Sequence, residues 1–164
     1  MPFRVTAEDY AQQIRTELGD FWLPNLYRTR VLKIRTRAYN FGTIERHPRV
    51  EIQHTLLGVE LKVGRRRLLC PDLATARYLS VFARAGCKEV AVPYDITKVS
   101  RCADELESSW YRMLLLADHH AADRDDAFRT RINGLLIAKI RAEIAEAGSG
   151  TAIPEFRQST RQRN

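Results

Sequence analysis

Long hydrophobic runs are missing from this sequence of 164 residues. No apolar stretch approaches the roughly 18 residues that a membrane-spanning helix needs, and the first ten residues carry Glu8 and Asp9 instead of the apolar core of a signal peptide. Extensive disorder is excluded as well, because 45% of the residues are hydrophobic. We therefore expect a soluble, cytoplasmic protein with no membrane partner.

Cysteine is scarce, and the common catalytic motifs are absent. Cys70, Cys87 and Cys102 are the only cysteines, and no two form a C-x-x-C pair. This spacing argues against a zinc knuckle or a thiol redox motif, so we predict buried, reduced thiols. The sequence also lacks the glycine-rich dinucleotide loop, the Walker motif and the nucleophile elbow, so nucleotide-binding and hydrolase-triad functions have no motif behind them.

Positive charge, by contrast, is abundant and uneven. The chain has 27 Lys and Arg residues against 20 Asp and Glu, a formal charge of +7. Residues 1–71 carry 13 basic and 7 acidic residues, whereas residues 72–148 carry 11 and 12. Basic surface gathered in one half favours a polyanionic partner, and nucleic acid is the partner we expect.

Three regions have the apolar spacing of amphipathic helices. The first begins at Thr6, a good N-cap, and ends at Gly19. The second begins at Asp72 and ends at Gly86. Residues 97–147 contain two such patterns, which we predict to form an antiparallel helical hairpin.

Alternating apolar and polar residues predict short strands between these helices. In residues 31–39 the basic side chains share one strand face, opposite an apolar face; they are Lys33, Arg35 and Arg37. Residues 50–63 leave two alternatives because the apolar phase flips after Gly58: one long strand with a bulge, or two strands joined by a tight turn. Further strands are predicted at residues 66–70 and 89–94.

The predicted order describes one α/β domain over residues 1–148, with a core at 6–94 and an appended C-terminal antiparallel helical hairpin at 97–147. A flexible basic tail follows at 149–164. The apolar stripe of the hairpin, with Trp110, Met113 and Ile140, favours a lid over the sheet. The alternative is a docking or homodimer surface.

Glu60 and Lys62 are the sharpest catalytic candidates. They are two residues apart on a predicted strand, so they project from one face. A carboxylate beside an ammonium on a rigid strand can bind a divalent metal and position a water for phosphodiester cleavage. This E-x-K, followed by a helix and an apolar strand, resembles the PD-(D/E)XK nuclease superfamily, and its Holliday-junction-resolvase-type members most of all.

The resemblance implies a restriction-endonuclease-like αβββαβ core with a mixed sheet over residues 6–94. It implies that Glu60 binds Mg²⁺ and that Lys62 orients the nucleophilic water. A second acid is implied on a neighbouring strand, where Glu51 is the best-placed candidate, so Glu51 and Glu60 are the expected metal ligands. An acid of the first helix, Glu8 or Glu17, could also serve.

The separation of Glu51 and Glu60 decides whether they can share a metal. In one continuous strand they would lie about 30 Å apart, at roughly 3.3 Å per residue. With a tight turn at Leu57 and Gly58, Thr55 falls opposite Glu60, and only a bulged or skewed register brings the two acids together.

A basic patch is the second candidate site. The run Arg65, Arg66 and Arg67 would join Lys33, Arg35 and Arg37 if their strands are neighbours, and guanidinium groups bind phosphates well. Tyr27 and Tyr39 could add base stacking. Two functions therefore remain open: a nucleic-acid-binding protein with a nuclease-like core, in its strong form an Mg²⁺-dependent endonuclease, or a non-catalytic module that binds nucleic acid or protein.

Two other features are interpreted structurally. His54 falls on the apolar face of its strand, where we expect a core histidine. Asp118, His119 and His120 are metal-ligand residue types and spell the signature of DHH phosphoesterases, but they follow a predicted helix rather than a core strand. Helix capping explains the acids after them; these are Asp123, Asp125 and Asp126.

Overall fold

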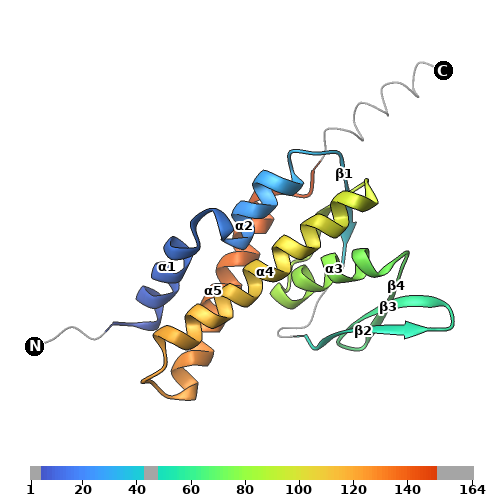
Figure 1. Cartoon of the computed structure of the whole chain (residues 1–164). Helices are drawn as coiled ribbons and strands as arrows, with labels where there is room; N and C mark the ends of the chain where they lie inside the picture. Colours follow the sequence, from blue (N-terminus) through green and yellow to red (C-terminus); the bar gives the residue numbers. More distant parts are fainter. Residues whose placement is uncertain (1–4, 43–47, 151–164) are drawn as a thin grey trace, which may run out of the picture.

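The computed structural model describes residues 5–42 and 48–150 and shows a mixed α/β chain, as predicted (Figure 1). Helices account for most of these residues, and the strands are short. In chain order the elements are α1 (Ala7–Leu18), the 3-10 turn η1 (Gly19–Phe21), α2 (Leu23–Leu26), the π-helical turn η2 (Tyr27–Val31), β1 (Thr36–Asn40), β2 (Val50–Thr55), β3 (Gly58–Val63), β4 (Arg66–Cys70), α3 (Leu73–Ala85), β5 (Glu89–Pro93), α4 (Ile96–His120) and α5 (Asp126–Ala147).

The helix boundaries follow from capping residues, which confirms the predicted ends of α1 and α3. Thr6 and Asp9 form a capping box at the start of α1. The Asp72 carboxylate accepts a hydrogen bond from the Thr75 N–H at 2.7 Å. Gly86 ends α3 in the left-handed conformation, with φ of 75°.

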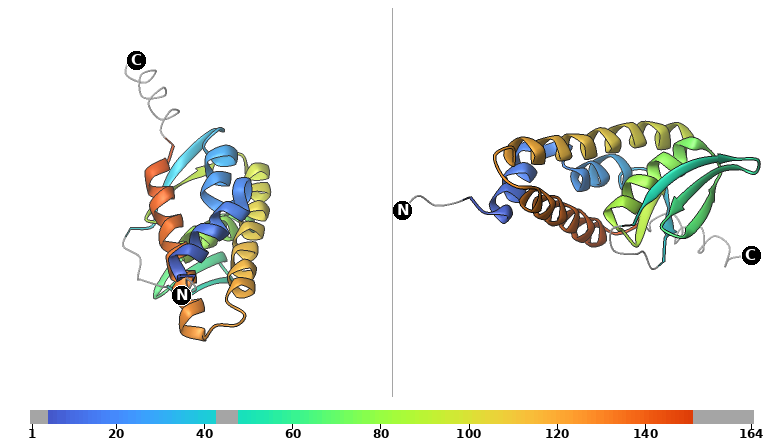
Figure 2. Two further views of the ribbon diagram at one scale, coloured as in Figure 1. Left: turned by 90° about the vertical axis from the view of Figure 1, so that its left-hand side faces the viewer. Right: turned by 90° about the horizontal axis from the view of Figure 1, so that it is seen from below.

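α4 and α5 run antiparallel and diverge from their connection, with α1 and α2 lying between them (Figure 2). The two predicted helices are therefore present as an antiparallel pair, but they are part of the helical core instead of an appendage: they pack mainly on α1, α2 and α3, and both also contact β5. Its stripe, with Trp110, Met113 and Ile140, is buried within this chain and is not free to bind a second one. No helix of the described ranges combines the length and the apolar character of a membrane span. The predicted tail lies outside the described residues beyond Gly150.

The strand predicted at residues 31–39 is only partly correct. Val31 still belongs to η2, where the Leu32 N–H donates to the Tyr27 carbonyl at 3.0 Å. Val31 is buried because η2 packs into the helical core, although the predicted alternation placed it in phase with the basic residues Lys33 and Arg35. β1 begins at Thr36 and pairs antiparallel with β5, so the period-two pattern before Thr36 is coincidental.

β2, β3 and β4 form a separate antiparallel sheet of two successive hairpins. The tight-turn alternative is confirmed, with the turn at Leu56 and Leu57 and with Thr55 paired to Gly58. One face of the sheet packs on α3 through buried residues such as Leu61 and Val63. His54 lies near the hairpin tip and is exposed, so the expected core histidine is wrong.

The single mixed sheet is not formed by the described residues, which instead make a two-stranded and a three-stranded antiparallel sheet. Tyrosine side chains explain why β5 pairs only with β1. The Ala91 N–H donates to the Tyr27 hydroxyl at 2.8 Å, and the Tyr78 hydroxyl donates to the Ala91 carbonyl at 2.5 Å. Because Ala91 is bonded in this way on the edge away from β1, that edge cannot accept a further strand there.

Candidate functional site

One face of the three-stranded sheet points away from α3 and carries mostly polar side chains. In an antiparallel sheet, residues directly opposite one another project to the same side. The register pairs Glu51 with Lys62 and Lys62 with Arg67, and it pairs Gln53 with Glu60 and Glu60 with Leu69. We call this surface the polar face; it consists of Glu51, Gln53, Glu60, Lys62, Arg67 and Leu69.

Lys62 lies between an acidic side chain on β2 and a second cationic side chain on β4. Glu51 is directly opposite it on β2, and Arg67 is directly opposite it on β4. The two-residue turn at Gly64 and Arg65 makes Lys62 and Arg67 a non-hydrogen-bonded pair, whose Cα atoms are typically about 4.5 Å apart. Like charges placed directly opposite on a sheet are destabilising, and an anion bound between them would relieve this repulsion.

Glu51 and Glu60 share the polar face as diagonal neighbours, and this relation was not foreseen. Gln53, rather than the expected Thr55, lies opposite Glu60, because the turn begins one residue earlier than predicted. Diagonal residues on neighbouring strands have Cα atoms about 7–8 Å apart. The hairpin therefore brings together Glu51, Glu60 and Lys62.

Glu60 has an unusual environment. Its Oε2 atom is buried and has no hydrogen-bond partner among the described residues. Burial of an unpartnered carboxylate oxygen is costly, so an external donor or cation would stabilise it. The Glu51 carboxylate, in contrast, already forms an ion pair with Arg49, whose Nε atom lies 3.1 Å from Oε1.

The two carboxylates fit only a minimal metal site. Mg²⁺ in phosphate-binding sites takes one or two carboxylates and completes its shell with water and phosphate oxygens. Glu51 and Glu60 could supply those two ligands. The described ranges contain no group of three or more His, Cys, Asp or Glu side chains able to hold a metal, so neither Glu8 nor Glu17 joins them.

The predicted basic patch divides into two groups because β1 and β4 belong to different sheets. Lys33 lies in a turn and Arg35 just before β1, so of the first three cations only Arg37 is on a strand. The Arg35 guanidinium stacks on the Tyr94 ring at 4.8 Å. Five residues of chain lie between Arg35 and Phe41, a span of roughly 20 Å if extended, and Phe41 contacts the second group.

The second group surrounds the β3–β4 turn. Arg65 occupies the turn, and Arg67 projects from the polar face beside Lys62. Arg66 has the opposite phase and donates to the Phe41 carbonyl, so it ties β4 to the end of β1. With Arg49, which bonds through its carbonyl to the Gly64 N–H, this end of the polar face is strongly basic.

The two tyrosines proposed for base stacking are not equivalent. Tyr27 is fully buried, and its hydroxyl donates to the Gly148 carbonyl at 2.5 Å, so it cannot stack on a base. Burial raises its pKa to about 12. Tyr39 is half-buried and packs edge-on against Phe41 at 5.0 Å.

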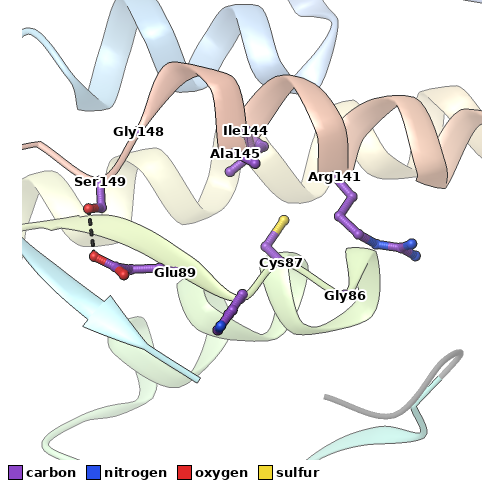
Figure 3. A pocket seen from close by; sticks show the side chains of 9 residues that line it. Gly86, Cys87, Glu89, Arg141, Ile144, Ala145, Gly148 and Ser149 are labelled. Atoms are coloured by element: carbon purple, nitrogen blue, oxygen red, sulfur yellow. Dashed lines mark hydrogen bonds between the residues drawn. The ribbon is translucent and has the colours of Figure 1, made fainter. Parts of the chain in front are cut away.

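A concavity of about 420 Å³ lies between the start of β5 and the last turns of α5 (Figure 3). Three of its polar side chains already have partners. Arg141 donates to the Ala85 carbonyl at 3.0 Å, and Ser149 donates to Glu89 at 2.8 Å. Burial raises the pKa of the Cys87 thiol to about 12, so it remains protonated and unreactive at neutral pH. We assign this concavity no chemistry.

Asp118 and His120 in the last turn of α4 and Asp125 before α5 have structural roles. Asp125 caps α5 by accepting from the Phe128 N–H at 2.9 Å, as predicted. His120 contacts Glu17 at 3.1 Å, and Asp118 pairs with Arg129 at 3.4 Å. These pairings explain the residue types without a metal.

Comparison of the chain with protein-family models, with curated proteins and with solved structures found no match.

Proposed function

We propose that the protein binds nucleic acid through the polar face and the adjoining β3–β4 turn. The observation that carries the proposal is the cross-strand pair of Lys62 and Arg67 on the sheet face turned away from α3, with the exposed Arg65 at the turn beside it. Two adjacent cations held by a rigid sheet can contact one phosphate backbone together, and the guanidinium of Arg67 can bind a phosphate in a bidentate way.

The two ends of the polar face differ in charge, so only one of them suits a phosphate backbone. The end away from the β3–β4 turn is not basic. There, Glu60 and the 64% exposed Leu69 replace the cations. A phosphate backbone would therefore follow the basic end, near Arg65 and Arg49. The PD-(D/E)XK relationship remains part of the proposal and rests on the Glu60-x-Lys62 spacing alone, because the described residues form two separate antiparallel sheets instead of the single mixed sheet that the relationship implies.

The test is fluorescence anisotropy with labelled duplex DNA, single-stranded DNA and RNA at 50 and 200 mM salt. A double variant, Lys62→Gln with Arg67→Gln, removes the pair while leaving the α3-facing core untouched. Each lost phosphate contact lowers the slope of log affinity against log salt by about 0.9 for duplex DNA. We therefore expect the slope to fall by about 1.8 and the affinity at 50 mM salt to fall at least tenfold.

Lys139→Gln on α5 is the matched control because it removes one positive charge away from the sheet. It should leave the salt dependence almost unchanged. The single variants Lys62→Gln and Arg67→Gln are measured beside it. If each loses as much affinity as Lys139→Gln, the effect is one of net charge and the proposal is contradicted. Absence of binding at 50 mM salt also contradicts it.

A second function, metal-dependent phosphodiester cleavage, is favoured by the unpartnered Oε2 atom of Glu60 next to Glu51 and Lys62. In this proposal the two carboxylates hold Mg²⁺, which supplies charge stabilisation at a phosphate, and Lys62 donates hydrogen bonds to the attacking water or to the phosphate. Cleavage of the same labelled substrates, with Mg²⁺ or Mn²⁺ and with EDTA, tests it. Metal-dependent cleavage should disappear in Glu60→Gln; binding without cleavage leaves the first function alone.

A further inference from the structure

Among the described residues, no strand pairs with the outer edge of β2. The tight turns at both ends of β3 fix the hydrogen-bonding pattern, in which Glu51, Gln53 and Thr55 bond toward β3. The N–H and C=O groups of Val50, Ile52 and His54 must therefore point outward. Within residues 5–42 and 48–150, no backbone hydrogen bond joins these groups to another segment.

The two edges of this sheet are protected differently. β4 carries Arg66 and Arg67, and charged side chains of this kind discourage the addition of another strand. β2 offers only one charged residue, Glu51, among β-forming side chains, and its Val50 and Ile52 are only half-buried. An unprotected edge with unpaired backbone groups is chemically matched to one kind of partner, an extended strand.

We propose that this strand is β2 of a second copy of the chain, so that two three-stranded sheets join into one of six strands. Antiparallel pairing centred on Ile52 brings all outward groups of residues 50–54 into hydrogen bonds. On the polar face it places Glu51 opposite the partner's Gln53, which can donate to the carboxylate. The register centred on Glu51 is disfavoured because it would set two glutamates directly opposite each other.

The side chains of the opposite face also match in this register. Ile52 meets the partner's Ile52, and Val50 meets the partner's His54. Leu56, which is fully exposed at the hairpin tip, comes opposite the partner's Pro48. The two-fold axis lies perpendicular to the joined sheet, so both polar faces point to the same side and their Lys62 and Arg67 pairs form one larger surface.

Sedimentation velocity of the full chain between about 1 and 100 µM tests the proposal. A single strand pairing is a small interface, so we expect a dimer that forms reversibly within this range. His54→Pro removes an outward N–H without breaking the bonds to β3, so it should abolish the dimer while circular dichroism shows an unchanged fold.

Charge substitutions on Gln53 test the register. Gln53→Glu sets an acid opposite the partner's Glu51 and should weaken association at least tenfold, whereas Gln53→Lys should strengthen it. A chain that is monomeric at 100 µM overturns the proposal and leaves the edge to a strand of another protein. A dimer that His54→Pro leaves intact uses another surface and also overturns it. Nucleic-acid binding by the monomeric variant is measured separately, so either proposal can fail without the other.

Discussion

The helical body, by which we mean the helices with the β1–β5 pair, and the three-stranded sheet satisfy the hydrogen bonds of their polar groups in different ways. In the body, polar side chains join segments that are far apart in sequence. Glu143 on α5 accepts from Arg15 and from the Trp22 indole N–H at 3.0 and 3.1 Å, and Arg28 lies 3.3 Å away. In the sheet, strand pairing is local, and one face and at least one edge lack partners among the described residues. We infer that the body holds the fold together and that the sheet is the part available for recognition.

The strongest test of this division is Glu143→Ala. Removal of the carboxylate leaves Arg15, Arg28 and Trp22 without their shared acceptor, so we expect a loss of about 3 kcal/mol in the free energy of unfolding, as measured with urea. Glu146→Ala, an exposed acid on the same helix, is the control and should change stability by less than about 0.5 kcal/mol.

The effect of Glu143→Ala should depend on pH. Burial raises the pKa of Glu143, but hydrogen bonds from Arg15, Trp22 and Arg28 outweigh this, and the net pKa is lowered. The folded state therefore binds the proton less readily than the unfolded chain. The contribution is complete above the ordinary glutamate pKa of about 4.3 and is lost as pH falls through the lowered folded value. A stability difference that did not shrink between pH 7 and pH 3 would contradict this.

The reaction rates of the cysteine thiols can be used to compare local opening of the sheet with local opening of the body in one molecule. Cys70 lies in β4, whereas Cys87 and Cys102 lie in the body, and all three are buried with raised pKa values. If the sheet opens without the body, Cys70 should react with Ellman's reagent at pH 8 about 100-fold faster than Cys87. Single-cysteine variants provide the comparison, and equal rates would show that both regions open together.

Tyr27→Phe removes the hydroxyl that links β5 to the end of α5. The Ala91 N–H then loses its acceptor in a buried position, so we expect a loss of about 2 kcal/mol. Thermal or urea unfolding measures it. Tyr111→Phe, at an exposed position on α4, should have almost no effect.

The smallest expected change in the free energy of unfolding is a gain in stability, and it comes from a substitution on the polar face. Glu60→Gln replaces an unpartnered buried carboxylate oxygen with an uncharged amide, so we expect a gain of about 1 kcal/mol. Gln53→Asn, on the same face, serves as the comparison. A loss of stability instead would mean that Glu60 has a structural role.

The sequence predicted local structure better than strand partners. The caps at Thr6, Asp72 and Gly86 could be recognised because their chemistry depends on residues within one turn. The pairing of β5 could not, because it depends on the hydroxyls of Tyr27 and Tyr78, which meet Ala91 only in the folded chain. Period-two spacing also misled at residues 31–35, because Val31 ends η2 and residues 32–35 form a turn and a short connection instead of a strand.

The candidate site was predictable in its residue types but not in its geometry. The E-x-K spacing placed Glu60 and Lys62 on one face, as the structure has them. A turn that begins one residue earlier than expected then decides that Glu51 lies opposite Lys62. The predicted basic patch included too many residues, because Lys33 and Arg35 precede the strand and Arg66 points toward the Phe41 carbonyl.

The contacts of Tyr27 and Glu143 also bear on how the chain folds. They join residues 121 and 128 positions apart, linking the first turns of the chain to the end of α5. Long loops must close before such contacts form, which slows folding relative to a bundle with local contacts. During synthesis the body cannot be completed until residue 148 is available, whereas the β2–β4 hairpins need only neighbouring residues. The sheet can therefore form early, and its open edge is exposed while the rest of the core is still incomplete.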